Sequence, residues 1–170
     1  MGIIRLKPVM FNVRLGSRGP TIHKETLNIL RDMRNKFVSD IIEKIANDNK
    51  INGKEEIRKI VISELLRYNY ELLNNREFIE EFVELIDFAL NTIIKKHIHN
   101  RKFLLDIVNK IIDISERQDV FRKNINGMLE MAIGGDHRLL YYYDERSGTM
   151  VISHIAKHVS SGKLKVIGSL

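Results

Sequence analysis

The sequence predicts a mainly α domain: a five-helix bundle with a small antiparallel β-sheet formed by the N-terminal strand and a C-terminal hairpin, which is an α+β fold. Three observations predict it. Apolar residues recur at the helical period of about 3.6 residues across residues 21–135, and they alternate at period two near both ends of the chain. The stretch 77–99 is apolar around most of its circumference, which is typical of a helix buried inside a bundle.

The N-terminal segment, residues 3–15, is expected to be extended. Apolar Val9, Phe11, Val13 and Leu15 alternate with more polar neighbours, a pattern that indicates a half-buried strand. Pro8 lacks the amide N–H that a strand ladder needs, so the strand is expected to kink there or to lie at a sheet edge. Glycines and a proline in residues 16–20 predict a loop.

Five helices are expected to follow, each with an apolar face at helical spacing and most with a polar cap. They span residues 21–48, 52–72, 77–99, 100–111 and 115–132. The third is the expected central helix. Gly134 and Gly135 are expected to stop the fifth helix, as C-terminal glycines do.

The C-terminal region returns to period two. Leu139, Tyr141 and Tyr143 share one face, residues 145–148 form a turn, and Met150 and Ile152 continue the alternation, which predicts a β-hairpin. Residues 163–167 are expected to form a further short strand. Because a lone hairpin is marginal in water, we expect the N-terminal strand to join it.

The chain of 170 residues is expected to be a single domain, 1–170. Its parts are a basic N-terminal strand and loop (1–20), a helical bundle (21–135), and a C-terminal hairpin and tail (136–170). The net charge of +6 is carried by the ends. Residues 1–24 hold five basic groups and no acid, residues 25–135 hold 18 basic and 19 acidic groups, and residues 136–170 hold five basic and three acidic groups.

Composition excludes several classes of protein. There are no cysteines, which removes disulfides, thiolate metal sites and cysteine nucleophiles. No apolar run approaches the roughly 20 residues that cross a bilayer, so no membrane partner is expected. The first residues lack a signal-peptide pattern. We therefore expect a cytoplasmic location, or a virion interior, and not secretion.

The residue types of catalytic sites do not form convincing patterns. No Gly-Lys-Ser/Thr phosphate loop and no nucleophile elbow is present. His154 and His158 are four residues apart, but the intervening glutamate of a metalloprotease helix is missing, and His97 and His99 point apart on a helix. Acids such as Glu80 fit a solvated helix edge. We expect no enzyme activity, metal, cofactor or small-molecule substrate.

The basic ends carry the main functional hypothesis, a non-catalytic protein that binds DNA or RNA through the phosphate backbone. If both ends meet in one sheet, their cations form a single surface, and one tyrosine of the hairpin faces outward to stack on bases. The residues predicted to bind nucleic acid are Arg5, Lys7, Arg14, Arg18, Arg138, Tyr142, Arg146, Lys157, Lys163 and Lys165.

Two alternatives remain open at this point. The aliphatic surplus of the helices is also typical of a structural or assembly subunit, of a capsid or a ribonucleoprotein complex, that acts through protein–protein contacts. Such a protein self-associates as a dimer or larger oligomer, and the terminal hairpin is able to add a strand to a neighbour. The two roles are compatible in a dimer. A small regulator that binds another protein is the third option.

Overall fold

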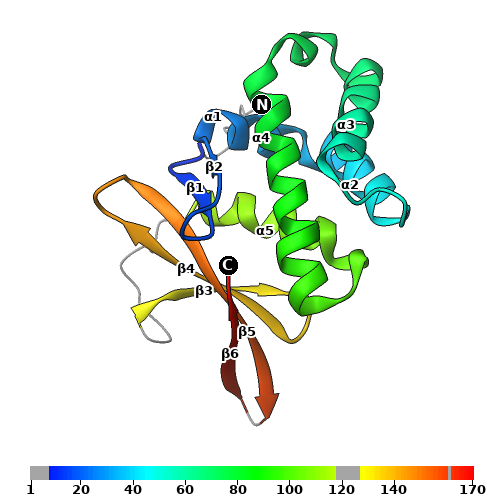
Figure 1. Cartoon of the computed structure of the whole chain (residues 1–170). Helices are drawn as coiled ribbons and strands as arrows, with labels where there is room; N and C mark the ends of the chain where they lie inside the picture. Colours follow the sequence, from blue (N-terminus) through cyan, green and yellow to red (C-terminus); the bar gives the residue numbers. More distant parts are fainter. Residues whose placement is uncertain (1–7, 118–126, 161) are drawn as a thin grey trace, which may run out of the picture.

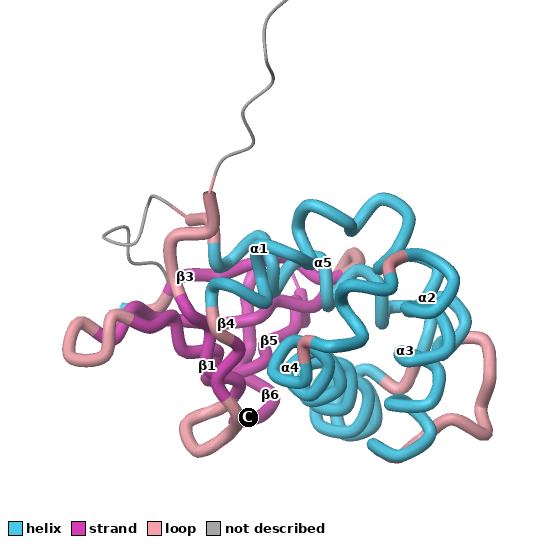
Figure 2. The backbone as a smooth tube through the Cα atoms, turned by 90° about the horizontal axis from the view of Figure 1, so that it is seen from above, coloured by secondary structure: helices cyan, strands magenta, loops and turns pink. Residues whose placement is uncertain are grey.

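The structure, a computed structural model, describes residues 8–117, 127–160 and 162–170. These residues form four helices and a six-stranded mixed sheet, an α+β fold. The helices lie to one side of the sheet, and the last of them packs against it (Figure 1). The view from above separates the strands from most of the helical layer (Figure 2).

Each of the four helices combines α-helical residues with a π-helical or 3-10 segment. The first consists of α1 (Lys24–Met33), the π-helical η1 (Arg34–Val38) and α2 (Ser39–Ala46), and the second is α3 (Lys54–Tyr68), followed by the short η2 (Tyr70–Asn74). The third consists of α4 (Arg76–Asp87) and the π-helical η3 (Phe88–Ile98), and the fourth of η4 (Arg101–Phe103) and α5 (Leu104–Ser115).

The strands are β1 (Asn12–Leu15), β2 (Thr21–Ile22), β3 (Leu129–Ile133), β4 (His137–Asp144), β5 (Thr149–Ser160) and β6 (Lys163–Ser169). Their order is β2-β1-β5-β4-β3, and β6 also pairs with β5. On one side, β5 pairs along its length with β4. On the other side, β1 pairs with its first part and β6 with its second part. The two ends of the described chain therefore meet on one strand.

The fold prediction is wrong about the fifth helix. The chain from Leu129 to Ile133 is β3, which pairs antiparallel with β4, and most of the rest of the expected helix, residues 118–126, lies outside the described residues. Leu129, Met131 and Ile133 face the core at period two, and so short an apolar run fits either period. Gly134 does not stop a helix. It forms the turn between β3 and β4 with φ +57°, a conformation that favours glycine.

The predicted small antiparallel sheet is also wrong, because the sheet is larger and mixed. The N-terminal strand does pair with the C-terminal hairpin, but β1 runs parallel to β5, with Val13 opposite Met150. A parallel pair needs a long crossover connection. Here the connection in the sequence from β1 to β5 contains the whole helical layer and the β3–β4 hairpin. Only Asn12–Leu15 of the expected N-terminal segment is a strand among the described residues.

Two predicted elements are confirmed. The central helix, expected over residues 77–99, runs from Arg76 to Ile98 as α4 and η3. Its end is set by His99, whose φ of 62° is the left-handed conformation common after a helix. The hairpin with a turn at residues 145–148 is β4 and β5. Alternation places Leu139 and Tyr141 in the core beneath the helices.

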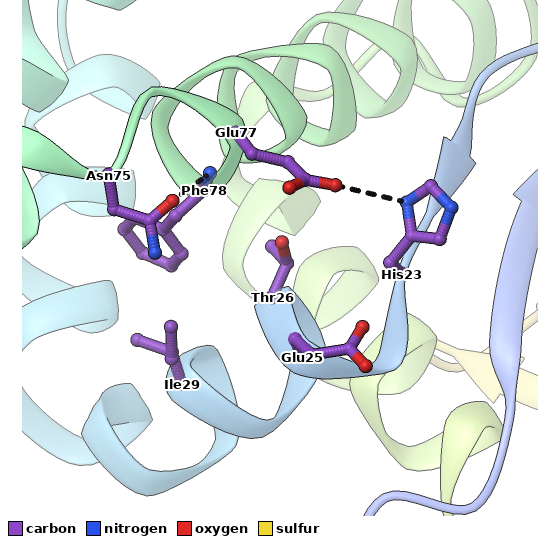
Figure 3. A pocket seen from close by; sticks show the side chains of 7 residues that line it. All are labelled: His23, Glu25, Thr26, Ile29, Asn75, Glu77 and Phe78. Atoms are coloured by element: carbon purple, nitrogen blue, oxygen red, sulfur yellow. Dashed lines mark hydrogen bonds and ion pairs between the residues drawn. The ribbon is translucent and has the colours of Figure 1, made fainter.

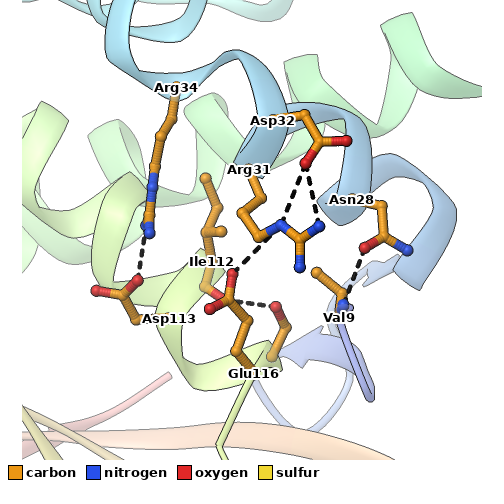
Figure 4. A network of polar contacts seen from close by, with 9 residues as sticks. Val9, Asn28, Arg31, Asp32, Arg34, Ile112, Asp113 and Glu116 are labelled. Carbon is orange, nitrogen blue, oxygen red and sulfur yellow. Dashed lines mark hydrogen bonds and ion pairs between the residues drawn. The ribbon is translucent and has the colours of Figure 1, made fainter. Parts of the chain in front are cut away.

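Aromatic and polar contacts hold the helical layer together. Phe37 from η1 lies 6.4 Å from Phe78 and 6.3 Å from Phe82, measured between ring centroids. At the edge of the same layer, Arg34 donates to Asp113 of α5 at 2.6 Å, and Arg31 contacts Asp32 (Figure 4). The first helix is therefore fixed both to α4 and to α5.

Arg101 joins two helices by capping the C-terminal end of α2. Its Nη2 donates to the carbonyl oxygens of Ile45, Asp48 and Ile51 at 2.7, 2.9 and 2.8 Å. Its Nη1 donates to Asn52 Oδ1 at 3.1 Å. Ile45 O and Asp48 O also accept the backbone N–H groups of Asp48 and Ile51, so the guanidinium adds a second donor to these two carbonyls and supplies a donor to Ile51 O.

We predict that Arg101→Ala lowers the free energy of unfolding by about 3 kcal/mol, because it removes several hydrogen bonds from a charged donor to partly buried carbonyls. Arg101→Lys should recover only part of the loss, since an ammonium lacks the planar fork. The neighbouring exposed residue offers a control, and Lys102→Ala should change stability by less than about 0.5 kcal/mol. Urea unfolding measures all three; equal effects of the two alanine variants would contradict this assignment.

Candidate nucleic-acid interface

A row of three basic side chains crosses the sheet beyond the end of the long helix. His137 of β4 lies opposite Lys157 of β5, and Lys157 lies opposite Lys165 of β6. Residues that face each other across strands project from the same face of a sheet. Leu139 lies two residues from His137 and belongs to the core, so the row continues the core-facing side past the area that helices cover.

The C-terminal end of η3 lies beside this row, and a glycine permits the approach. A methyl group at Gly168 of β6 would overlap the imidazole of His97, whose Nε2 would be 2.8 Å away. Gly168 pairs with Ile155, which lies two residues before Lys157 on β5, and Lys157 pairs with Lys165. We call His97, His137, Lys157, Lys163 and Lys165 the basic ledge.

The two histidines of the basic ledge are hard to protonate. Burial lowers the pKa of His97, and the neighbouring charges of Lys96 and His99 lower it further. Burial also lowers the pKa of His137, as does Lys157, while Asp136 acts in the opposite direction. Both imidazoles therefore remain neutral at pH 7 and gain charge only if the pH falls or an anion comes close.

The structure brings three of the predicted residues together. Lys157, Lys163 and Lys165 are all exposed and lie on the hairpin of β5 and β6, which projects from the body of the molecule (Figure 1). Arg14 and Tyr142 lie elsewhere, on the outer face of the sheet, where both flank Val151 in register. Tyr142 is 37% exposed.

The remaining predicted residues are dispersed. Arg138 donates to the carbonyl oxygens of Gly135 and His137 at 3.2 and 2.8 Å, and alternation places it on the outer face. Arg18 and Arg146 are exposed in the β1–β2 loop and the β4–β5 turn. Arg5 and Lys7 lie outside the described residues.

Sequence reasoning did not select His97 and His137 as members of this surface. His97 is about forty residues from His137 in the chain, and their electrostatic contact exists because η3 ends over β6. Gly168 is the signal that was available, since a glycine within a strand often marks a close approach of another group. The glycine does not reveal which group approaches.

Several cations of the helical layer are paired with acids, whereas the lysines of the basic ledge are not, in the part of the chain that the structure describes. Lys44 donates to Glu64 at 2.8 Å, Lys54 to Glu84 at 2.8 Å and Arg58 to Glu80 at 2.7 Å. Among the residues that the structure describes, Lys157 and its two neighbouring lysines form no salt bridge.

Comparison of the chain with protein-family models, curated proteins and solved structures finds no match. Within the described ranges, no helix has the length and apolar character needed to span a membrane.

We predict that the free energy of unfolding decreases as the pH falls below about 6.5. The unfolded imidazoles take up protons near that pH, whereas His97 and His137 have lower pKa values in the folded protein. The unfolded state then binds more protons, so acid favours it until the pH falls below the folded-state values. Urea unfolding from about pH 7.5 to about pH 5.5 measures the decline.

The variant with His97→Gln and His137→Gln should show a shallower decline. His23 acts in the opposite sense, because the hydrogen bond that its imidazole donates to Glu81 raises its pKa. The control His23→Gln should therefore make the decline steeper. A double variant with the same pH profile as the wild type would show that these two histidines do not determine it.

Proposed function

We propose that this protein binds nucleic acid without catalysing a reaction, and that it contacts the phosphate backbone through the basic ledge. The observation that carries the proposal is the row His137, Lys157 and Lys165 on three adjacent strands. Like charges directly opposite each other destabilise a sheet. The directly opposed pair Lys157 and Lys165, which forms no salt bridge among the described residues, is explained if it binds an external polyanion.

The chemistry of the row fits phosphate. Lysine ammonium groups donate to phosphate oxygens as point charges and require no fixed angle. A bound phosphate would also favour the protonated form of His137, which its burial and Lys157 oppose in the free protein. Strand spacing of about 4.8 Å places the three groups within reach of neighbouring phosphates on one strand of nucleic acid.

Little base readout is expected from this surface. Tyr142, the aromatic residue predicted to stack on bases, lies on the outer face of the sheet with Arg14, away from the basic ledge. Without an aromatic platform beside the lysines, affinity should depend mainly on charge and should vary little with sequence.

We predict that the wild type binds a labelled oligonucleotide at about 50 mM salt and that affinity falls steeply as salt increases. The variant with Lys157→Gln and Lys165→Gln should bind more weakly, and its slope against the logarithm of salt should be smaller by about 0.7–0.9 for each lost contact. Fluorescence anisotropy with single-stranded and duplex DNA and RNA measures both quantities.

A matched control removes two charges from the helical layer. Lys50 and Lys59 are exposed and distant in sequence from the basic ledge. Lys50→Gln with Lys59→Gln changes the net charge equally and should leave the salt slope unchanged. The proposal fails if the wild type does not bind, or if both double variants lose affinity equally.

An assembly subunit remains the second candidate, favoured by an apolar stripe on α3. Ile62 and Leu66 lie one turn apart on the helix, share a face and are 36% and 47% exposed. Tyr70, which is 72% exposed, follows the end of α3 as the first residue of η2.

For this role, light scattering should show a mass above that of the monomer that increases with concentration. Leu66→Lys should reduce it by placing a charge in the contact. A monomer at every concentration would exclude self-association through α3, and it would leave the nucleic-acid experiment unaffected.

A further inference from the structure

Three metal-ligating side chains converge at the other end of the long helix. His23 precedes α1, and Glu77 and Glu81 lie one turn apart at the start of α4. One ligand atom from each lies within 4.8 Å of the other two. His23 Nδ1 is 2.9 Å from Glu81 Oε2 and 3.9 Å from Glu77 Oε1. Figure 3 shows the Glu77 carboxylate directed at the imidazole.

Local structure orients two of the three groups. Glu81 is 13% exposed, and its Oε1 accepts the backbone N–H of His23 at 2.6 Å, which leaves Oε2 on the side of the imidazole. His23 is placed by β2, because the adjacent Ile22 is buried opposite Val13 of β1. Glu77 is 75% exposed and is free to adjust its rotamer.

A cavity adjoins this cluster and is itself acidic. It has a volume of about 200 Å³ and is lined by His23, Glu25, Thr26, Ile29, Asn75, Glu77 and Phe78. No lysine or arginine belongs to that lining. The hydrogen bond that His23 donates to Glu81 raises the pKa of His23, and the charges of Glu81, Glu77 and Glu25 raise it further. Three carboxylates thus face one imidazole, and the cavity leaves room for water beside a bound ion.

We propose that His23, Glu77 and Glu81 bind a divalent transition-metal ion of the Zn²⁺ class. Bonds of about 2.1 Å in a tetrahedral arrangement separate neighbouring ligand atoms by about 3.4 Å. The separations of 2.9 and 3.9 Å from Nδ1 lie on either side of that value, so a small movement of Glu77 completes the site. Solvent in the cavity supplies the remaining ligand.

The ligand set distinguishes this class of ion from the alkaline earths. Mg²⁺ and Ca²⁺ prefer an all-oxygen shell, whereas imidazole favours Zn²⁺ and its neighbours. The ion replaces the proton that His23 Nδ1 shares with Glu81, so binding releases a proton whenever the imidazole was charged. The alternative is that His23 and Glu81 serve only as an ion pair that attaches the start of α1 to α4.

Calorimetric titration of the metal-free full chain with ZnCl₂ separates these two possibilities. The wild type should bind one ion at this site, and MgCl₂ should give no comparable heat. Glu77→Gln and His23→Gln should each weaken zinc binding by at least about tenfold, the lower end of the loss seen for outer-shell partners. Glu77→Gln keeps the hydrogen bonds of Glu81 intact, so the fold is preserved. Glu145→Gln, in the β4–β5 turn, is the matched control and should bind as the wild type does.

Thermal unfolding provides a second readout. Zinc should raise the melting temperature of the wild type and of Glu145→Gln by mass action, and it should not do so for Glu77→Gln. The proposal is overturned if the wild type binds no zinc. It is equally overturned if Glu77→Gln and His23→Gln bind zinc as tightly as the wild type, because other histidines then hold the ion.

Discussion

The hydrogen bonding of β5 is the constraint on which the rest of the structure depends. On one side it is paired with β4 from Thr149 to Lys157, and its other side is shared end to end by β1 and β6. Gly16 N–H donates to Ile152 O at 2.9 Å, and Leu170 N–H donates to Ser153 O at 2.8 Å. Two segments from opposite ends of the chain therefore meet at adjacent residues of one strand.

This arrangement explains why helices do not cover the basic ledge. The N-terminal part of β5 carries β1, whose connection through β2 leads directly into α1 and the helical layer. The C-terminal part carries β6 and extends past the point where η3 ends over Gly168. Helices bury the first part of the strand, and the second part stays exposed with Lys157 on it. The basic ledge lies where that cover ends.

The two proposed sites lie at opposite ends of the same helix, α4 with η3, which is about 30 Å long. Glu77 and Glu81 are near its N-terminal end, and Lys96 and His97 are near its C-terminal end. Part of this distribution suits the helix dipole, which favours acids at the first turn and bases at the last. The dipole does not account for the acidic cavity beside His23 or for lysines on separate strands, and these additional charges are what suggest ligands.

The features of the fold that could be predicted are those that depend on residues close together in the sequence. The central helix and the β4–β5 hairpin were predictable, because an apolar period and a turn are local properties of consecutive residues. The excess of positive charge at the two ends was also evident from composition. The prediction of a helix over residues 115–132 was wrong at Leu129–Ile133. This apolar run is short enough to fit both periods, and its strand pairing with β4 overrode the helical spacing.

The type of most elements and the placement of charge along the chain follow from the order of the residues alone. The parallel pairing of β1 with β5, the contact of His97 with Gly168, and the meeting of His23 with Glu77 and Glu81 arise only when the chain is folded. These contacts join segments tens of residues apart. They arise because buried backbone groups must find partners wherever the chain can supply them, and no local pattern specifies which partner that is.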